Sequence, residues 1–328
     1  MKIVFVVEKK EDPGTRLRML PVFESVRKEK ADVKFIGAPK GLAGRVMMLA
    51  GLAGTDVLVL YRKLFKRFEL IIIRFLCKRI VYDYDDALMF REVRLGKTLT
   101  AGPLRRFLRT VDASDEVVAG NSFLADFARQ NCGKVNVLPT PIDTVRLVPR
   151  EVTRDSNEVI IGWIGLKGNL VYLEELSGVF QRLALKHPNI ALSIICNRFI
   201  DIDGVNVYKR MWSVDDEARF LQEMDIGIMP LTDDLWSRGK CGFKILQYFG
   251  AGKPAVASPV GINSEIIRHG VNGFLAGSEG EWEEFLSAMV SDRPLRERMG
   301  SEGRKAVEER YSLDKYLKRY SSIIGIGQ

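Results

Sequence analysis

The chain contains 328 residues, of which 46% are hydrophobic and 28% charged; this globular composition suits two domains of about 150 residues and excludes a disordered protein. Its formal charge is +8, but residues 1–150 hold 28 basic and 17 acidic residues, a net +11, whereas residues 151–328 hold 22 and 25, a net −3. Such asymmetry is typical of proteins in which one half alone meets a polyanion, a membrane or a nucleic acid.

The cysteines and the N-terminal residues indicate a reducing compartment. Four cysteines stand singly, without a C-x-x-C pair, so the sequence predicts neither a disulfide framework nor a zinc site. The apolar run that begins at Ile3 is five residues long, too short for the core of a signal peptide. No stretch approaches about 18 apolar residues. We expect a cytoplasmic protein, at most peripheral on the inner face of a membrane.

Strands and helices alternate along the first half. A β-branched run at residues 3–7 is followed by a turn-rich loop and by apolar residues at helical spacing. The alternation continues with expected strands at 33–36, 57–61, 80–84, 116–119 and 135–138, and expected helices at 42–53, 65–76, 104–113 and 122–130. Strands that alternate with helices of about ten residues predict a parallel, doubly wound sheet.

A second series follows a polar stretch at residues 149–157, which we interpret as the domain linker. Expected strands lie at 159–164, 191–196, 205–208, 226–229 and 255–257, and expected helices at 172–186, 215–223, 243–250, 264–269, 280–291, 294–311 and 312–324. The sequence therefore predicts an α/β protein with two Rossmann-like domains, whose parallel sheets face each other across a ligand-binding cleft.

The first strand-to-helix loop carries Gly14 and Arg16. A glycine in this turn permits close approach of the backbone to a phosphate at the helix N-terminus. Only one glycine is present rather than the pattern G-x-G-x-x-G, which disfavours dinucleotide binding of the dehydrogenase kind. A plain helix start explains these residues equally well.

A strongly basic segment runs from Arg62 to Arg79 and holds seven cations and one acid among apolar residues. One interpretation is an amphipathic basic helix on an anionic membrane surface. The other is a core helix with a solvated charged face. Residues 70–73 are apolar on every side of the helix, which favours deep burial.

Three carboxylates, Asp83, Asp85 and Asp86, lie at the end of the expected strand 80–84. Catalytic groups sit at the carboxyl ends of strands in such sheets. A metal site, a structural acid cluster and a catalytic or acceptor-facing role all remain open. Both histidines, His187 and His269, lie in the second half, so the first half offers no histidine base. Asp85 and Asp86 are the best candidates for catalytic residues, and we expect no metal.

Cations precede the expected helix 243–250. Arg238 and Lys240 lie on a turn-rich loop, and the helix begins close to Gly242, so its free N–H groups and its positive dipole end face the same region. Such a place binds phosphate. Lys167 follows the strand 159–164 and is a further candidate to line a phosphate pocket. The simpler interpretation is a solvated basic loop for Arg238 and Lys240, and a helix start capped by Asn169 for the segment of Lys167.

The run from residue 225 to residue 275 resembles the donor-binding half of the retaining glycosyltransferases of group 1, also called family 4, which have the GT-B fold. Residues 159–165, 118–125, 137–143 and 310–313 carry the resemblance further. Members of the family usually have two glutamates seven residues apart, which here fall on Gly239 and Gln247. Gln247 can still accept a hydrogen bond from a ribose hydroxyl, whereas Gly239 has no side chain to replace the glutamate. Because both carboxylates are missing, the chain resembles a branch of the family that lacks the paired glutamates.

The resemblance implies a role for each candidate residue. The donor-binding residues are Gly14, Arg16, Lys167, Arg238, Lys240, Lys244 and Gln247, with the two lysines Lys240 and Lys244 meeting the charge of the donor diphosphate. Front-face attack, in which the leaving phosphate takes the acceptor proton, needs no strong base. The implied domains are residues 1–148 on the acceptor side, residues 149–311 on the donor side, and a C-terminal helix at 312–328 that packs back on the first domain.

We therefore expect a metal-independent retaining glycosyltransferase of the hexosyltransferase type, without a cofactor, that acts in the synthesis of cell-envelope polysaccharide or glycolipid. Its partners are a nucleotide diphosphate sugar, a sugar or lipid-linked acceptor, and an anionic membrane surface at residues 62–79. The alternative is a nucleotide-sugar-binding or epimerase-like protein without transferase activity. We expect no nucleic acid partner, because strands with interleaved aromatic residues for stacking on bases are absent from the sequence.

Overall fold

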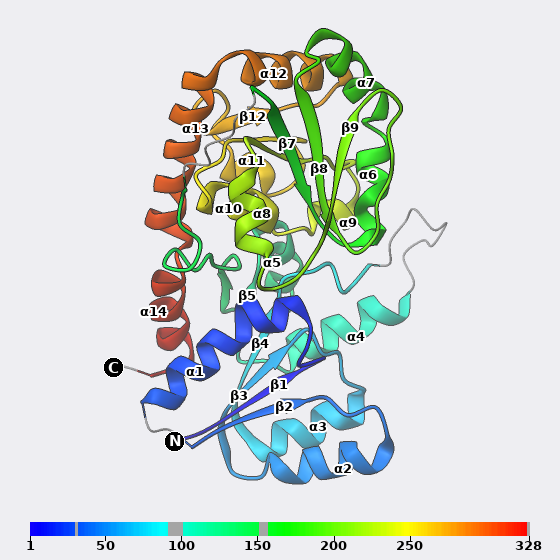
Figure 1. The fold of residues 1–328 in the computed structure, drawn as a ribbon. Coiled ribbons are helices and arrows are strands. Elements are labelled where there is room, and N and C mark those ends of the chain that lie inside the picture. The colour runs from blue at the N-terminus through cyan, green and yellow to red at the C-terminus, as the bar shows by residue number, and fades with distance from the viewer. Residues whose placement is uncertain (30–31, 91–100, 151–156, 327–328) are drawn as a thin grey trace. The chain divides into compact units, whose positions relative to one another are not determined.

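The computed structural model describes residues 1–29, 32–90, 101–150 and 157–326, which form two compact units. Unit 1 contains Met1–Pro141, Asp234–Cys241 and Asp314–Gln328, and unit 2 contains Ile142–Asp233 and Gly242–Leu313. Each unit has a parallel six-stranded sheet with helices packed against it (Figure 1). The predicted α/β class with two Rossmann-like sheets is confirmed. The predicted domain boundaries stay predictions, and residues 151–156 of the predicted linker lie outside the described residues.

The sheet of unit 1 has the strand order β2-β1-β3-β4-β5-β6. Its strands are β1 (Lys2–Val7), β2 (Asp32–Gly37), β3 (Thr55–Tyr61), β4 (Cys77–Tyr84), β5 (Glu116–Ala119) and β6 (Val135–Val137). The helices are η1 (Thr15–Met19), α1 (Leu20–Lys28), α2 (Leu42–Gly51), α3 (Arg67–Leu76), α4 (Ala101–Asp112), α5 (Ser122–Arg129), α9 (Leu235–Arg238) and α14 (Leu313–Ile324), with all but the first residue of α14 in this unit.

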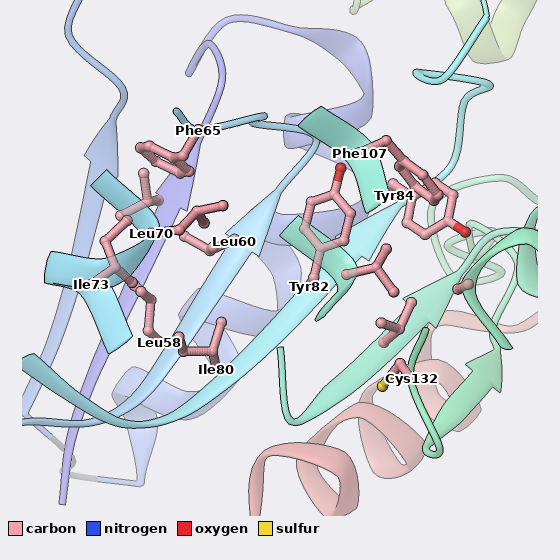
Figure 2. Packing of buried hydrophobic residues seen from close by; sticks show 14 of the residues in the cluster. Leu58, Leu60, Phe65, Leu70, Ile73, Ile80, Tyr82, Tyr84, Phe107 and Cys132 are labelled. Atoms are coloured by element: carbon pink, nitrogen blue, oxygen red, sulfur yellow. The ribbon is translucent and has the colours of Figure 1, made fainter. Parts of the chain in front are cut away.

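The core of unit 1 forms because its strands are apolar on both sides. Every residue of β1 after Lys2 is buried, as expected for a parallel sheet that helices cover. One cluster joins side chains of the sheet to the inner sides of α2, α3 and α4: Leu58, Leu60, Ile80 and Tyr82 from the sheet, and Met48, Leu49, Leu70, Ile73, Phe107 and Val111 from the helices (Figure 2). These three helices therefore cover the same face of the sheet.

The sheet of unit 2 has the strand order β12-β11-β10-β7-β8-β9. Its strands are β7 (Val159–Ile164), β8 (Ile190–Cys196), β9 (Asn206–Met211), β10 (Ile226–Met229), β11 (Ala255–Ala257) and β12 (Gly273–Leu275). The helices are η3 (Lys167–Asn169), α6 (Leu170–Glu174), α7 (Ser177–Lys186), α8 (Glu217–Glu223), α10 (Phe243–Gly250), α11 (Asn263–Ile266), α12 (Glu279–Ser291), α13 (Arg293–Ala306) and η4 (Val307–Tyr311).

Three elements differ from the expectation. The expected helix 172–186 is two helices, α6 and α7, separated at residues 175–176. Strand β12 and helix α9 were not expected, because three or four residues are too few for a periodic pattern. Asp234 begins α9 by accepting a hydrogen bond from the backbone N–H of Ser237 at 2.7 Å. Within the part of the chain that the structure describes, no helix is long and apolar enough to span a membrane.

The last helix, α14, packs within unit 1. Its tyrosines Tyr316 and Tyr320 are buried, and the Tyr316 hydroxyl donates a hydrogen bond to the backbone oxygen of Arg18 at 3.3 Å. The ring of Tyr316 also lies 5.5 Å from the guanidinium carbon of Arg18. The helix thereby supports the start of α1, next to the loop that carries Gly14.

Candidate functional site

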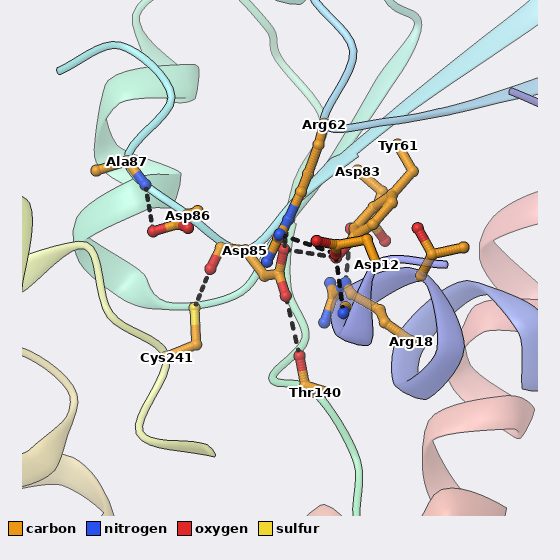
Figure 3. Close-up of polar contacts among 12 residues, drawn as sticks. Asp12, Arg18, Tyr61, Arg62, Asp83, Asp85, Asp86, Ala87, Thr140 and Cys241 are labelled. Atoms are coloured by element: carbon orange, nitrogen blue, oxygen red, sulfur yellow. Dashed lines mark hydrogen bonds and ion pairs between the residues drawn. The ribbon is translucent and has the colours of Figure 1, made fainter. Parts of the chain in front are cut away.

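Asp85 is the centre of a polar network at the carboxyl edge of the unit 1 sheet (Figure 3). Its Oδ1 accepts hydrogen bonds from the Tyr61 hydroxyl at 2.8 Å and from Arg62 Nε at 2.5 Å. Thr140 Oγ1 donates to its Oδ2 at 3.4 Å. Burial alone would raise the pKa of Asp85, but the Arg62 guanidinium, followed by that of Arg18, lowers this pKa below its ordinary value. Asp85 therefore stays ionised and is a weak proton acceptor.

Arg62 has an unusual backbone conformation. Among the described residues it alone is a non-glycine residue in the left-handed region, with φ 58°. This conformation costs of order 1 kcal/mol or more and persists where surrounding contacts hold it. Arg62 follows β3 and links two carboxylates, since its Nη1 also lies 3.2 Å from Asp12 Oδ2. The arginine thus connects the loop after β1 to the loop after β4.

The backbone of Gly14 lies close to this network. A Cβ at Gly14 would overlap the Tyr61 hydroxyl and would lie 3.0 Å from Arg62 Nη2. Its N–H donates to Asp12 Oδ2 at 2.9 Å, and its φ of −63° is helical. The glycine is therefore required by close packing and not by a left-handed turn. Arg16 lies two residues further along the chain and is half-buried.

Asp83 lies beneath the network and forms a buried ion pair. Arg18 Nε lies 2.6 Å from Asp83 Oδ1, and both side chains are fully buried. Burial raises the pKa of Asp83 to about 6, although Arg18 opposes the shift. Arg18 Nη1 also donates to the backbone oxygen of Leu138 at 2.6 Å. The pair joins η1 to β4 and to the segment after β6, which is a structural role.

Asp86 has a different environment from Asp85. Its carboxylate is partly exposed, and Lys240 Nζ lies 3.6 Å from Asp86 Oδ1. The same ammonium lies 4.5 Å from the Trp236 ring centroid. The sequence placed Asp86 and Lys240 in two separate candidate sites, 154 positions apart, and the structure brings them together within unit 1.

Asn121 holds the loop that carries Arg238 and Lys240, and sequence reasoning did not single it out as a site residue. It is buried, and its side-chain oxygen caps α5 by accepting from the Leu124 N–H at 2.7 Å. Its Nδ2 donates to the backbone oxygens of Arg238 at 3.1 Å and of Lys240 at 2.9 Å. An asparagine immediately before a helix is a capping signal, but no sequence pattern shows the two bonds to a distant loop.

Gly239 lies between these two cations and faces the residue after Asp86. A Cβ at Gly239 would lie 2.5 Å from the Ala87 Cβ. The sulfur of Cys241 donates to the backbone oxygen of Asp85 at 3.2 Å. Because Ala87 occupies the space, a larger side chain at position 239 would require this loop to move.

The candidate residues Lys167, Lys244 and Gln247 lie in unit 2, near the carboxyl end of β7 or on α10. Lys244 Nζ lies 5.4 Å from the ring centroid of Trp163, on β7, and Lys167 is exposed just beyond that strand. Gln247 is buried one turn after Lys244 on α10. Helix α10 begins after Gly242, whose φ of 65° belongs to the left-handed region that glycine adopts readily.

Unit 2 also has a pocket of about 310 Å³ at the carboxyl ends of β10, β11 and β12, lined among others by Thr232, Ser258 and Glu279. A larger cavity of about 820 Å³ lies at the opposite edge, where Glu158, Asp225 and Pro254 precede their strands. Ligands in open α/β sheets bind at the carboxyl edge, so the smaller pocket is the better candidate. Within the described residues, no group of three or more His, Cys, Asp or Glu side chains could hold a metal ion.

Comparisons with known proteins identify the family that one segment matches and the fold of the chain. Residues 167–291 match the family of group 1 glycosyl transferases. No curated protein sequence matches the chain. Among solved structures, Anabaena HepE in complex with UDP and glucose is 14% identical, with a TM-score of 0.73 over 99% of this chain and 100% of that one.

Two further structures have the same fold. Sucrose-phosphate synthase from Thermosynechococcus elongatus is 10% identical, with a TM-score of 0.71 over 98% of each chain. A glycosyltransferase from Rickettsia africae is 14% identical, with a TM-score of 0.70 over 98% of this chain and 97% of that one. At such identities the likeness shows the fold. The predicted resemblance and the predicted fold are both confirmed.

Proposed function

We propose that this chain, which carries a group 1 glycosyl transferase domain and has the GT-B fold, is a retaining glycosyltransferase that transfers a hexosyl group from a nucleotide diphosphate sugar. The match of residues 167–291 to the family carries the proposal, because this segment includes Lys167, Lys244 and Gln247. The solved structures of HepE with UDP and with UDP-glucose support a donor of this class. The product belongs to cell-envelope polysaccharide or glycolipid synthesis.

In unit 2, the carboxyl edge of the sheet receives the donor. Lys244 lies in the first turn of α10, where an ammonium and the positive end of the helix act together on a diphosphate. The family resemblance also implies donor-binding roles for Gly14, Arg16, Arg238 and Lys240, which lie in unit 1, and we propose these roles separately. Positive side chains can stabilise a leaving diphosphate without a metal, so we propose a metal-independent reaction.

The carboxylates of unit 1 divide two tasks. Asp86 is partly exposed and lies beside Lys240, so it contacts the acceptor or the reacting sugar. Asp85 has a lowered pKa and is held by Arg62, so it positions the loop after β4 and maintains negative charge there. The leaving phosphate takes the acceptor proton in a front-face reaction, and no residue with a raised pKa is needed as a base.

A second candidate function is that of a nucleotide-sugar-binding or epimerase-like protein with the same fold and without transferase activity. Gly239 stands where the family usually has a glutamate, and Ala87 fills the space beside it. This observation favours a protein that binds a nucleotide sugar without transferring it. For both functions we propose a location in the cytoplasm, peripheral on the inner face of the membrane.

Thermal denaturation with a panel of nucleotide diphosphate sugars tests donor binding, since a ligand at 100 times its Kd stabilises by about 2.7 kcal/mol. Release of the nucleoside diphosphate with a panel of lipid-linked and free sugar acceptors then tests transfer, with and without EDTA. If a donor stabilises the protein but no acceptor leads to release of the nucleoside diphosphate, the binding function is favoured. No stabilisation by any donor would contradict both functions.

A further inference from the structure

The apolar residues of α2 and α3 do not all face the core. Leu70 and Ile73 pack on the sheet, as Figure 2 shows, but their neighbours point outward. On α3 the exposed residues recur at helical spacing, and on α2 they lie within one and a half turns: Phe68 (53% exposed), Ile71 (62%), Ile72 (39%), Phe75 (89%), Leu42 (76%), Val46 (57%) and Met47 (75%). We call these seven residues the apolar face.

The apolar face is one surface, because its two helices are fixed to each other. Helices α2 and α3 lie side by side on the same face of the sheet (Figure 1). Arg45 of α2 lies 3.3 Å from Glu69 of α3, whose other carboxylate oxygen accepts from the Lys66 N–H at 2.7 Å. Glu69 therefore starts α3 and ties it to α2, and the side chains opposite the core share one outward direction.

Cations lie beside the apolar face, at the start of α3 and on α4. Lys66 and Arg67 are exposed at the start of α3, and the Lys66 ammonium lies 6.0 Å from the Phe68 ring centroid. Helix α4, which packs beside α3, exposes Arg105, Arg106 and Arg109. None of these five cations has an ion pair within the described residues. The acids on the three helices are Glu69, which is buried, and Asp112.

We infer that the apolar face and the five cations beside it dock on an anionic lipid bilayer. Exposed apolar side chains of this number mark an interaction site in a protein, and such a face enters the boundary of headgroups and acyl chains by about 5–10 Å. The cations meet the anionic headgroups at the same depth. A second copy of this chain is a poorer occupant, because a two-fold contact would place like charges against each other.

This inference rests on the proposed membrane location. It adds the surface that makes the contact, which consists of the apolar residues of α2 and α3 and the arginines of α4. The burial of residues 70–73 expected from sequence is correct for Leu70 and Ile73 and wrong for Ile71 and Ile72. The sequence pattern favoured a buried core helix on this ground, whereas the structure shows a helix that is apolar on both its core side and its outer side.

Flotation of the full chain with lipid vesicles tests the docking surface. We expect the protein to float with phosphatidylcholine vesicles that contain about one third phosphatidylglycerol, and to float far less with pure phosphatidylcholine. The double variant Ile71→Ser/Phe75→Ser should lower the vesicle affinity by about tenfold or more. The matched control Leu185→Ser removes a side chain that is equally exposed (86%) in unit 2 and should bind like the parent.

Two further variants test the role of charge and the depth of insertion. Arg105→Gln/Arg106→Gln/Arg109→Gln should weaken the dependence on phosphatidylglycerol and on salt, because these charges act through the anionic lipid. Phe75→Trp should show a blue shift of tryptophan emission with anionic vesicles, and Leu185→Trp should show none. These variants lie outside the proposed donor and acceptor residues, so thermal stabilisation by donor measures the proposed function separately.

Flotation that is absent, or equal for the parent and the Ile71→Ser/Phe75→Ser variant, would overturn the inference. A parent chain that is dimeric in analytical ultracentrifugation, with a monomeric Ile71→Ser/Phe75→Ser variant and no flotation, would assign the face to a second copy instead. Loss of flotation with intact donor stabilisation in that variant supports the inference.

Discussion

Asp85 and Asp86 are adjacent in the sequence but have different surroundings. Asp85 accepts bonds from Tyr61 and Arg62, and its pKa is lowered, whereas Asp86 is partly exposed beside Lys240. The two carboxylates follow β4 directly, and successive residues of an extended chain point in opposite directions. One position is therefore committed to holding the loop, and the other remains accessible to a substrate.

The ammonium of Lys244 is expected to contribute to donor affinity. Lys244→Ala should raise the Kd for the nucleotide diphosphate sugar by about tenfold, since a charge-assisted bond to phosphate is lost. Isothermal titration with the donor measures this change. The control is Lys186→Ala, which removes an exposed lysine at the end of α7. Equal affinity for both variants would remove Lys244 from the donor site.

Gly239 is expected to tolerate no side chain. Gly239→Ala should lower the free energy of unfolding by about 1–3 kcal/mol, because its Cβ meets that of Ala87. Urea denaturation measures the loss, and adding Ala87→Gly should restore most of it. Gly168→Ala, where a new Cβ meets nothing within 4 Å, is the matched control. Gly239→Glu should accordingly not increase transfer, and a gain in activity would contradict this interpretation of the missing glutamate.

At the scale of elements, α5 and the loop after α9 depend on one amide. Asn121 caps α5 with its oxygen and bonds the loop with its nitrogen, so it couples a helix start to the segment that carries Arg238 and Lys240. Helix α3 also has one side chain with two roles, since Glu69 caps the start of the helix and joins it to α2. In each case a polar residue at a helix start determines where a second segment lies.

Asn121→Asp separates the two roles of this residue. The aspartate keeps the cap but cannot donate to the two carbonyl oxygens, whereas Asn121→Ala loses both interactions. We expect Asn121→Ala to cost about 2 kcal/mol or more and Asn121→Asp to retain the helix while weakening donor binding. Thermal unfolding and donor titration measure the two effects. Asn131→Ala, at an exposed position after α5, is the control. Identical donor binding in all three variants would separate Asn121 from the site.

For the whole molecule, the ionisation of Asp85 contributes to global stability. Asp85→Asn should lower the free energy of unfolding at neutral pH by about 3 kcal/mol, because it removes the closer of the two carboxylates that pair with the partly buried Arg62. The pKa of Asp85 is lowered in the folded chain, so this contribution is complete above the unfolded pKa of about 3.9 and is lost as the pH falls through the folded pKa.

Denaturation of the parent and of Asp85→Asn between about pH 3 and pH 7 checks this dependence. The difference between the two proteins should shrink at the acid end, and a constant difference would contradict it. Asp83 acts in the opposite direction, because its pKa of about 6 makes the folded chain bind a proton more readily, but it is present in both proteins. Asp126→Asn, which breaks an exposed pair with Arg129, should change stability by less than about 1 kcal/mol.

Periodicity predicted most of the architecture, because strands buried on both faces are continuous apolar runs. Strands β5, β7, β10 and β11 begin and end where the sequence places them. The short elements α9 and β12 were not predicted, because four and three residues are too few for a periodic pattern. The resemblance to group 1 glycosyltransferases was also readable from the sequence, because its motifs span the contiguous residues 225–275.

The α/β class, the alternation of elements and the chemistry available at each strand end could be predicted from the sequence. Which groups meet depends on the folded chain: Asp86 with Lys240, Asp85 with Arg62 and Tyr61, and Asn121 with the loop at 238–240. The structure also shows that α3 is apolar on its exposed side. Local pattern depends on neighbours three or four residues away, whereas these pairings depend on how the sheet order brings distant strand ends together.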